Sequence, residues 1–207
     1  MTAKDLIPAL QERLQTPLPG WQSQWELSSL PGRPRTPPDL HRKGAVLSLL
    51  YPHREELHMV FMKRTNDGKA HGGQISFPGG KQEPEDDTLH ITALRESEEE
   101  LGIIQREVQV LGGLTTLYIP ASNFLVQPVV GYAANRPIFR PSPVEVDEIL
   151  EVSVAQLLQT PVSTTSVTVN SGFTFDAKAF LVNDQIIWGA TAMMLNELLT
   201  AIRDISS

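Results

Sequence analysis

A short glycine-rich turn followed by an acidic helix constrains the fold of this chain more than any other stretch. Phe77-Pro78-Gly79-Gly80 precedes the run Arg95-Glu96-Ser97-Glu98-Glu99-Glu100-Leu101-Gly102-Ile103. Residues 86–88 are all good N-caps, Gly102 is a good residue to end a helix, and the interval between them contains neither Gly nor Pro. A helix is therefore predicted over residues 88–101.

The predicted helix has two chemically different sides. At 3.6 residues per turn, Glu96, Glu99 and Glu100 fall within an arc of roughly 100°. The apolar residues on the opposite side are Ile91, Leu94 and Leu101. We expect the apolar side to pack on the core and the acidic side to face outward.

The clustered carboxylates suggest a bound cation, because like charges four residues apart destabilise a helix by about 0.2–0.5 kcal/mol per pair. Oxygen ligands suit Mg²⁺ or Mn²⁺, and proteins usually hold Mg²⁺ with a few carboxylates and the phosphates of a substrate. A solvated acidic surface is the alternative for any Glu-rich helix. Two neighbours favour the metal site: Gly79-Gly80 allows close approach of backbone, and Arg95 can tie the helix to the acidic loop 85–87.

These residues resemble the Nudix box of the Nudix hydrolases, whose usual form is G-x5-E-x7-R-E-U-x-E-E-x-G-U. The matching positions are Gly80, an acidic residue at Asp86 or Asp87, Arg95, Glu96, Glu99, Glu100, Gly102 and Ile103. The chain departs from the pattern twice: the interval from Gly80 to Arg95 is one residue longer, and Ser97 stands where an aliphatic residue is common. Neither departure touches the Arg-Glu-x-x-Glu-Glu centre of the motif.

A polar loop at residues 64–74 leads into this motif and narrows the resemblance. Arg64, Lys69 and free backbone N–H groups would converge there on phosphates. The loop is similar to the pattern L-L-T-x-R-S-x3-R-x3-G-Q-x-x-F-P-G-G of the coenzyme A pyrophosphatase branch. Met62 replaces its threonine and Lys69 its second arginine. Lysine keeps the charge but loses the bidentate fork of arginine. These two replacements bear on the identity of the substrate and not on the type of reaction.

The resemblance implies an α/β fold, the Nudix fold, in which an α/β/α sandwich contains a mixed β-sheet. It also implies metal-dependent hydrolysis of a nucleoside diphosphate linked to another moiety. Coenzyme A or its thioesters are the leading substrates and would give adenosine 3′,5′-bisphosphate and 4′-phosphopantetheine. One alternative is a pyrophosphatase acting on ADP-ribose or another nucleoside diphosphate derivative, and another is a non-catalytic nucleotide-binding module.

The same resemblance suggests roles for individual residues. Glu96, Glu100 and then Glu99 are the predicted ligands of Mg²⁺ or Mn²⁺, with the backbone carbonyl of Gly80, or alternatively of Gly79, as an addition. Glu99 and Arg95 are also predicted to act in catalysis. The predicted substrate-binding residues are Arg64, Lys69, Gly79, Gly80 and Tyr118, the last of which would stack on a base.

The proton acceptor is a separate question, because a glutamate bound to metal is a poor base. The segment Glu145-Val146-Asp147-Glu148-Ile149-Leu150-Glu151-Val152 resembles an acidic segment that enters a strand late in this branch. In an extended segment Glu145 and Asp147 share one face and Glu148 lies on the other. We expect Glu148 to be the base, since it directly precedes the apolar run. The alternatives are charges that merely flank a strand, with the role of base then returning to Glu99 or to another loop residue.

Composition excludes several classes of function. The net charge of −7 argues against a broad nucleic-acid or anionic-membrane surface, so a small nucleotide is the expected partner. The absence of Cys excludes disulfides, thiol nucleophiles and thiolate metal sites. The N-terminus lacks the form of a signal peptide and no apolar stretch is long enough to cross a bilayer, so a cytoplasmic protein is expected.

At 207 residues the chain is long enough for one well-buried core and short for two. We expect an N-terminal helix and a Pro-rich strap over residues 1–40, followed by a Nudix hydrolase domain over residues 41–207. Trp21 and Trp25 indicate that the strap packs on the body or on another subunit, which leaves a homodimer open. Expected strands are 45–51, 58–63, 108–111, 124–132, 148–154 and a meander at 167–169, 173–175 and 179–182, with a last helix over 189–205.

Overall fold

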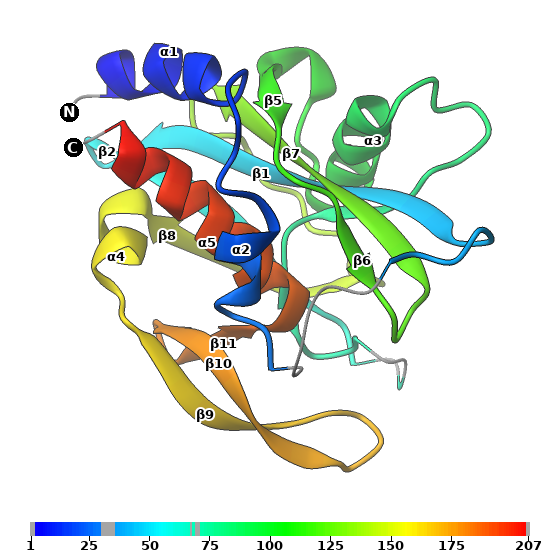
Figure 1. Ribbon diagram of the computed structural model, residues 1–207. Coiled ribbons are helices and arrows are strands. Elements are labelled where there is room, and N and C mark those ends of the chain that lie inside the picture. Colours follow the sequence, from blue (N-terminus) through cyan, green and yellow to red (C-terminus); the bar gives the residue numbers. More distant parts are fainter. Residues whose placement is uncertain (1–2, 30–35, 67, 69–70, 206–207) are drawn as a thin grey trace.

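The structure is a computed structural model that describes residues 3–29, 36–66, 68 and 71–205 (Figure 1). Lys69, a predicted phosphate-binding residue, lies outside the described residues. Within the described part of the chain, no helix is long and apolar enough to cross a membrane.

A mixed sheet of eight strands forms the centre of the molecule. Its strands are β1 (Arg42–His53), β2 (Glu56–Arg64), β3 (Ile75–Ser76), β4 (Gly79–Lys81), β5 (Val108–Gly113), β6 (Leu117–Ile119), β7 (Phe124–Ala133) and β8 (Val146–Ser153). The main order is β3-β2-β1-β7-β5, with β4 paired to β1, β6 to β7 and β8 to β2. Since β1 and β7 run parallel while β1 and β2 run antiparallel, the predicted mixed sheet is confirmed.

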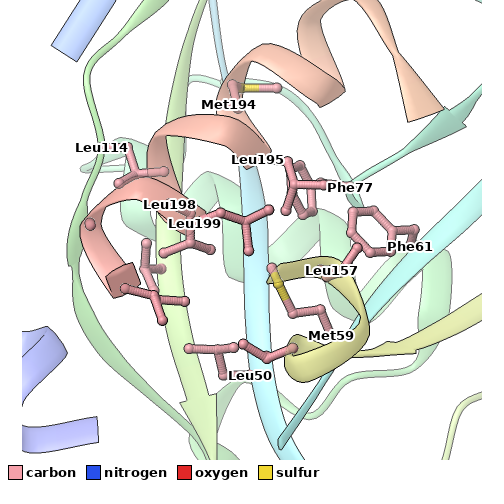
Figure 2. Packing of buried hydrophobic residues seen from close by; sticks show 14 of the residues in the cluster. Leu50, Met59, Phe61, Phe77, Leu114, Leu157, Met194, Leu195, Leu198 and Leu199 are labelled. Atoms are coloured by element: carbon pink, nitrogen blue, oxygen red, sulfur yellow. The ribbon is translucent and has the colours of Figure 1, made fainter. Parts of the chain in front are cut away.

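Helices cover both faces of this sheet (Figure 1). One face carries α3 (Leu89–Leu101), and the other carries α5 (Gly189–Asp204) with α4 (Val154–Gln159) beside it. Successive side chains of β1 point to opposite faces of the sheet and therefore pack in two separate hydrophobic clusters. Leu47 and Leu49 belong to the cluster on the α3 side, and Leu50 belongs to the cluster on the α5 side. Figure 2 shows the second cluster, where Phe61 and Phe77 lie with ring centroids 4.9 Å apart. This layering is the predicted α/β/α sandwich.

A second sheet of three strands lies below α5 in Figure 1. It contains β9 (Val162–Thr168), β10 (Thr174–Val182) and β11 (Gln185–Trp188), in the order β11-β10-β9. The prediction of two separate strands at 173–175 and 179–182 was wrong, because β10 continues through the polar residues between them. Asp176 accepts a hydrogen bond from Ser166 and Lys178 donates one to the Glu26 carbonyl, so both side chains have partners on an unbroken strand.

The N-terminal segment packs on the body of the same chain. It contains α1 (Ala3–Arg13) and a short helix, α2 (Gly20–Trp25), that the sequence did not predict within the strap. A fully buried carboxylate of α5, Glu197, accepts hydrogen bonds from the Gly20 N–H, the Gln24 amide and the Thr115 hydroxyl at 3.1, 2.7 and 2.6 Å. Trp21, by contrast, is 46% exposed and does not anchor the strap.

Candidate functional site

The acidic helix α3 begins and ends where its caps predict. The Thr88 hydroxyl accepts a hydrogen bond from the Ile91 N–H at 3.3 Å, which satisfies one free donor of the first turn. At the other end Gly102 has φ +71°, a left-handed conformation that glycine adopts without steric cost. Both signals are local, so the sequence alone was sufficient to place the ends of this helix.

Arg95 is fixed by a bidentate ion pair with Asp86. Its Nε and Nη2 donate to the two Asp86 carboxylate oxygens at 3.1 and 2.9 Å. The hydrogen bond from Arg95 lowers the pKa of Asp86 to about 2, and the Thr92 hydroxyl and the Glu83 N–H also donate to this carboxylate. Of the two acidic candidates left open by the motif spacing, the structure therefore pairs Asp86 with the helix, while the Asp87 side chain is exposed.

The Arg95 guanidinium also organises the neighbouring carboxylates. Its Nη1 donates to Glu96 at 3.0 Å and to Glu99 at 3.2 Å, and its Nη2 donates to the Lys81 carbonyl at 3.0 Å. One cation thus joins α3, β4 and the acidic loop, and holds two of the three predicted metal ligands. This arrangement agrees with the expectation that Arg95 ties the helix to that loop.

Glu100 is buried, with 2% of its surface exposed. Its Oε2 accepts a hydrogen bond of 2.7 Å from the Gly79 N–H, and its Oε1 lies 3.3 Å from Arg64 Nη1. Burial raises the pKa of Glu100 to about 7, against the opposing effects of the Gly79 N–H and the Arg64 charge. A carboxylate in this position stays incompletely compensated by the chain itself.

The expectation that the acidic side of the helix faces outward was therefore wrong for Glu100. The buried residues of α3 are Thr92, Ala93, Ser97, Glu100 and Leu101, whereas Ile91 is 38% exposed. The helix lies against β1 and β4, and the absence of side chains at Gly79 and Gly80 lets it approach closely. Ser97, at a position where an aliphatic residue is common, is satisfied by donating to the Ala93 carbonyl at 2.6 Å.

Gly80 and Glu96 form the second contact between β4 and the helix. A Cβ placed on Gly80 would lie 2.5 Å from the carboxyl carbon of Glu96, so only glycine leaves room for this side chain. Burial raises the pKa of Glu96, and the charges of Glu99 and Glu145 act in the same direction. Two desolvated carboxylates, Glu96 and Glu100, thus flank the Gly79-Gly80 backbone, which fits a site for a divalent cation.

The carboxylates do not form a closed cluster in this conformation. Across residues 3–29, 36–66, 68 and 71–205, no group of three His, Cys, Asp or Glu side chains has an arrangement that could hold a metal ion. The reason lies in their partners, because Glu99 and Glu96 accept from Arg95 while Glu100 accepts from Gly79 and Arg64. The assignment of Glu96, Glu99 and Glu100 as metal ligands stays a prediction.

Two other predicted site residues, Tyr118 and Glu148, make hydrogen bonds to side chains outside the group of α3 carboxylates. Tyr118 donates its hydroxyl to Asn123 at 2.9 Å, within the hairpin of β6 and β7. Glu148 accepts a hydrogen bond from the Gln185 amide of the small sheet at 3.3 Å. Their proposed roles in base stacking and proton transfer stay predictions.

Glu145 is the residue to which sequence reasoning gave too little weight. Its charge raises the pKa of both Glu96 and Glu100. Its backbone belongs to a turn that is bonded to the end of α3 and to the residue after β2: Ser142 N–H donates to the Glu100 carbonyl at 2.8 Å, and Thr65 N–H donates to the Glu145 carbonyl at 3.0 Å. The acidic run 145–151 was visible in the sequence, but the turn that selects Glu145 is a tertiary feature.

Comparison with known proteins identifies the family to which the chain is similar. A family model described as the NUDIX domain matches residues 41–167. The protein named Uncharacterized Nudix hydrolase NudL of Photorhabdus laumondii is 31% identical over 169 residues, which cover 82% of this chain and 89% of that protein. NudL of Yersinia enterocolitica is 33% identical over 145 residues, covering 70% and 74%. The crystal structure of a MutT/nudix family protein from Enterococcus faecalis shares the fold with a TM-score of 0.54 at 13% identity, covering 99% of this chain and 75% of that one.

Proposed function

The chain belongs to the Nudix family of hydrolases acting on nucleoside diphosphate derivatives, and on that basis we propose that it cleaves the diphosphate of coenzyme A or of its thioesters. It is a Nudix pyrophosphohydrolase, and the proposal concerns its substrate and the roles of its residues. The products would be adenosine 3′,5′-bisphosphate and 4′-phosphopantetheine, or the acylated form of the latter.

One contact carries this proposal: the approach of Arg64 to Glu100 at 3.3 Å. Arg64 is the arginine of the coenzyme A pattern, and its backbone is bonded to the Gly73-Gln74 part of the same pattern, with Gly73 N–H to Arg64 carbonyl at 2.9 Å and Arg64 N–H to Gln74 carbonyl at 3.0 Å. The substrate pattern and the acidic helix therefore meet at one place. Met62, which departs from the pattern, is fully buried, so this change affects packing and not ligand contact.

Each group of residues has a proposed task. Glu96, Glu100 and Glu99, with the Gly80 carbonyl, would hold Mg²⁺ or Mn²⁺. Such a cation would neutralise the diphosphate oxygens and lower the pKa of the attacking water. Arg95 holds the carboxylates in place, and Arg64, Lys69 and the backbone of Gly79 and Gly80 would bind the diphosphate. Tyr118 would stack on the adenine.

The proposed base is Glu148, and Glu145 is a second candidate because its backbone turn is hydrogen-bonded to the Glu100 carbonyl through the Ser142 N–H and to Thr65, the residue after Arg64. Glu148→Gln and Glu145→Gln distinguish the two. Substitution of the true base should lower kcat and alter the acidic limb of the pH–rate profile, while the affinity of the variant for the metal stays nearly constant. Unchanged profiles in both variants would return the role to Glu99.

Product analysis tests the proposed substrate. Purified protein with Mg²⁺ or Mn²⁺ is supplied with coenzyme A, acetyl-coenzyme A, ADP-ribose, NADH and dinucleoside polyphosphates. The proposal predicts adenosine 3′,5′-bisphosphate from both coenzyme A compounds at the highest rates in the panel. Preferred cleavage of ADP-ribose would instead assign the chain to the alternative substrate, and no cleavage of any compound would contradict catalysis at this site.

A further inference from the structure

A cavity of about 270 Å³ lies between the small sheet and the segment that follows β2. The sheet contributes Val167 from β9 and Ile186 and Trp188 from β11. Val167 pairs directly with Phe175, and the Phe175 ring meets the Trp188 ring edge-on at 5.7 Å, so these residues share one face of the sheet. The opposite wall contains Lys63 and residues 72–75.

The described residues that line the cavity carry one positive and one negative charge. Among the residues that the structure describes, the lining holds one cation, Lys63, and one anion, Asp184, together with the amides of Gln74 and Gln185 and the hydroxyls of Ser166 and Thr168. A pocket for phosphate would present an excess of cations and free N–H groups. This mixture of apolar surface, amides and hydroxyls instead matches an uncharged chain that carries amide and hydroxyl groups.

The cavity adjoins the proposed diphosphate site. Gly73 and Gln74 line it, and both are hydrogen-bonded through their backbones to Arg64, whose side chain contacts Glu100. On the other wall Gln185 donates to Glu148. A molecule whose diphosphate lies at Arg64 and Glu100 would therefore have one of its two substituents next to this cavity.

The sheet that forms one wall lies largely outside the shared family region. The NUDIX match ends at residue 167, so β10 and β11 belong to the part of the chain beyond it. Ligand pockets commonly measure about 300–1,000 Å³, so a cavity of about 270 Å³ suits part of a ligand better than a whole nucleotide. An added wall of this kind is suited to select the group attached to a common diphosphate.

We propose that this cavity binds the pantetheine-like arm of the substrate, an uncharged chain of amides and a hydroxyl joined to the second phosphate. The inference rests on the proposed function, and it names the small sheet as the part of the chain that distinguishes such an arm from a sugar. Ile186, which is half-buried and lines the cavity, is the position at which a larger side chain would obstruct the arm.

The test compares Ile186→Trp with Thr164→Trp, a matched control on the exposed surface of β9 that does not line the cavity. The substrates are 3′-dephospho-coenzyme A and ADP-ribose, which share ADP and differ only in the group on the second phosphate. Ile186→Trp is expected to lower the kcat/KM for 3′-dephospho-coenzyme A relative to that for ADP-ribose by about tenfold. Thr164→Trp should leave the ratio at its wild-type value, and near-UV circular dichroism of each variant checks that it is folded.

A binding measurement separates this inference from the proposed function. Pantetheine alone, without diphosphate, should shift the indole N–H signal of Trp188 in NMR spectra of the wild-type protein and of Thr164→Trp, but not of Ile186→Trp. Cleavage of coenzyme A without any such shift in the wild-type protein, or with an unchanged ratio in folded Ile186→Trp, would overturn the role of the cavity alone. A shift of Trp188 without cleavage of coenzyme A would support the cavity and overturn the proposed function.

Discussion

Glu100 shows at the scale of one residue how this site differs from a solvated acidic helix. A glutamate on a solvated helix face is exposed to water. Glu100 is instead only 2% exposed, accepts a hydrogen bond from the Gly79 N–H and lies close to Arg64. Burying a carboxylate with incomplete compensation costs free energy, which proteins tolerate mainly where the charge is used. The buried carboxylate and the glycine turn that bonds it therefore form the centre of the proposed site.

The first prediction concerns Glu100→Gln. The amide keeps the volume of the side chain and removes a proposed metal ligand, so kcat should fall by about 100-fold or more. The free energy of unfolding in EDTA should be unchanged or higher, because an incompletely compensated buried charge is gone. Turnover close to that of the wild-type protein at limiting Mg²⁺ would remove Glu100 from the metal site.

The second prediction concerns Asp86 and pH. Its folded pKa of about 2 is below the unfolded value of about 3.9, so the Arg95 pair stabilises the fold fully above about pH 4 and is lost as pH falls toward about 2. Asp86→Asn should lower the free energy of unfolding by about 2 kcal/mol near neutral pH. Urea titrations at several pH values should show this difference shrinking below about pH 4, and a difference independent of pH would mean that the charge contributes nothing.

At the scale of elements, β4 determines how α3 is held. Gly79 and Gly80 are adjacent, yet their surroundings differ. The atoms nearest to a Cβ on Gly80 would be those of the Glu96 carboxylate, at the far end of a side chain, whereas a Cβ on Gly79, where φ is +150°, would meet the backbone at Ala45 and Val46. The two glycines therefore have separable functions, one in the site and one in the fold.

A matched pair of substitutions tests that separation. Gly80→Ala should displace the Glu96 carboxylate and lower kcat/KM by about tenfold, with a change in stability within about 1 kcal/mol. Gly79→Ala should lower the free energy of unfolding by about 2–4 kcal/mol, because backbone cannot move aside as a side chain can. Kinetics and chemical denaturation of both variants decide the matter, and equal losses of stability would refute the distinction.

Local signals explain which elements were predictable from the sequence. The ends of α3 followed from Thr88 and Gly102, since a cap acts on its own turn. The burial of Glu100 did not follow, because it depends on Gly79, which lies 21 residues earlier in the chain and has no side chain to keep the helix away. The continuity of β10 was missed for a similar reason, as Lys178 finds its partner at Glu26.

At the scale of the whole molecule, the N-terminal segment and the C-terminal helix share one core. Leu6, Leu10 and Leu14 belong to the same cluster as Leu195 and other residues of α5, although the family match begins only at residue 41. The predicted boundary between residues 1–40 and 41–207 thus marks where the family match begins, while the residues on its two sides pack in one hydrophobic core. Glu197 joins the two parts through donors from both sides.

The fourth prediction follows from this connection. Glu197→Ala removes the shared acceptor of Gly20, Gln24 and Thr115, and leaving such buried donors unpaired costs about 1–3 kcal/mol each. The free energy of unfolding should fall by about 3 kcal/mol or more. Hydrogen exchange should show the largest loss of protection in α2, and an unaltered α2 would contradict the role of Glu197 as the link.

The most direct test of the central claim is the competition between coenzyme A and ADP-ribose in one reaction with limiting protein and saturating Mg²⁺. Both substrates contain an adenosine diphosphate group. At equal substrate concentrations, the ratio of the two initial rates of product formation equals the ratio of the two kcat/KM values, without correction for the active fraction. The account predicts that adenosine 3′,5′-bisphosphate forms faster than AMP by about tenfold, and that Glu100→Gln abolishes both products. Equal rates, or a preference for ADP-ribose, would contradict the assignment of coenzyme A as the substrate.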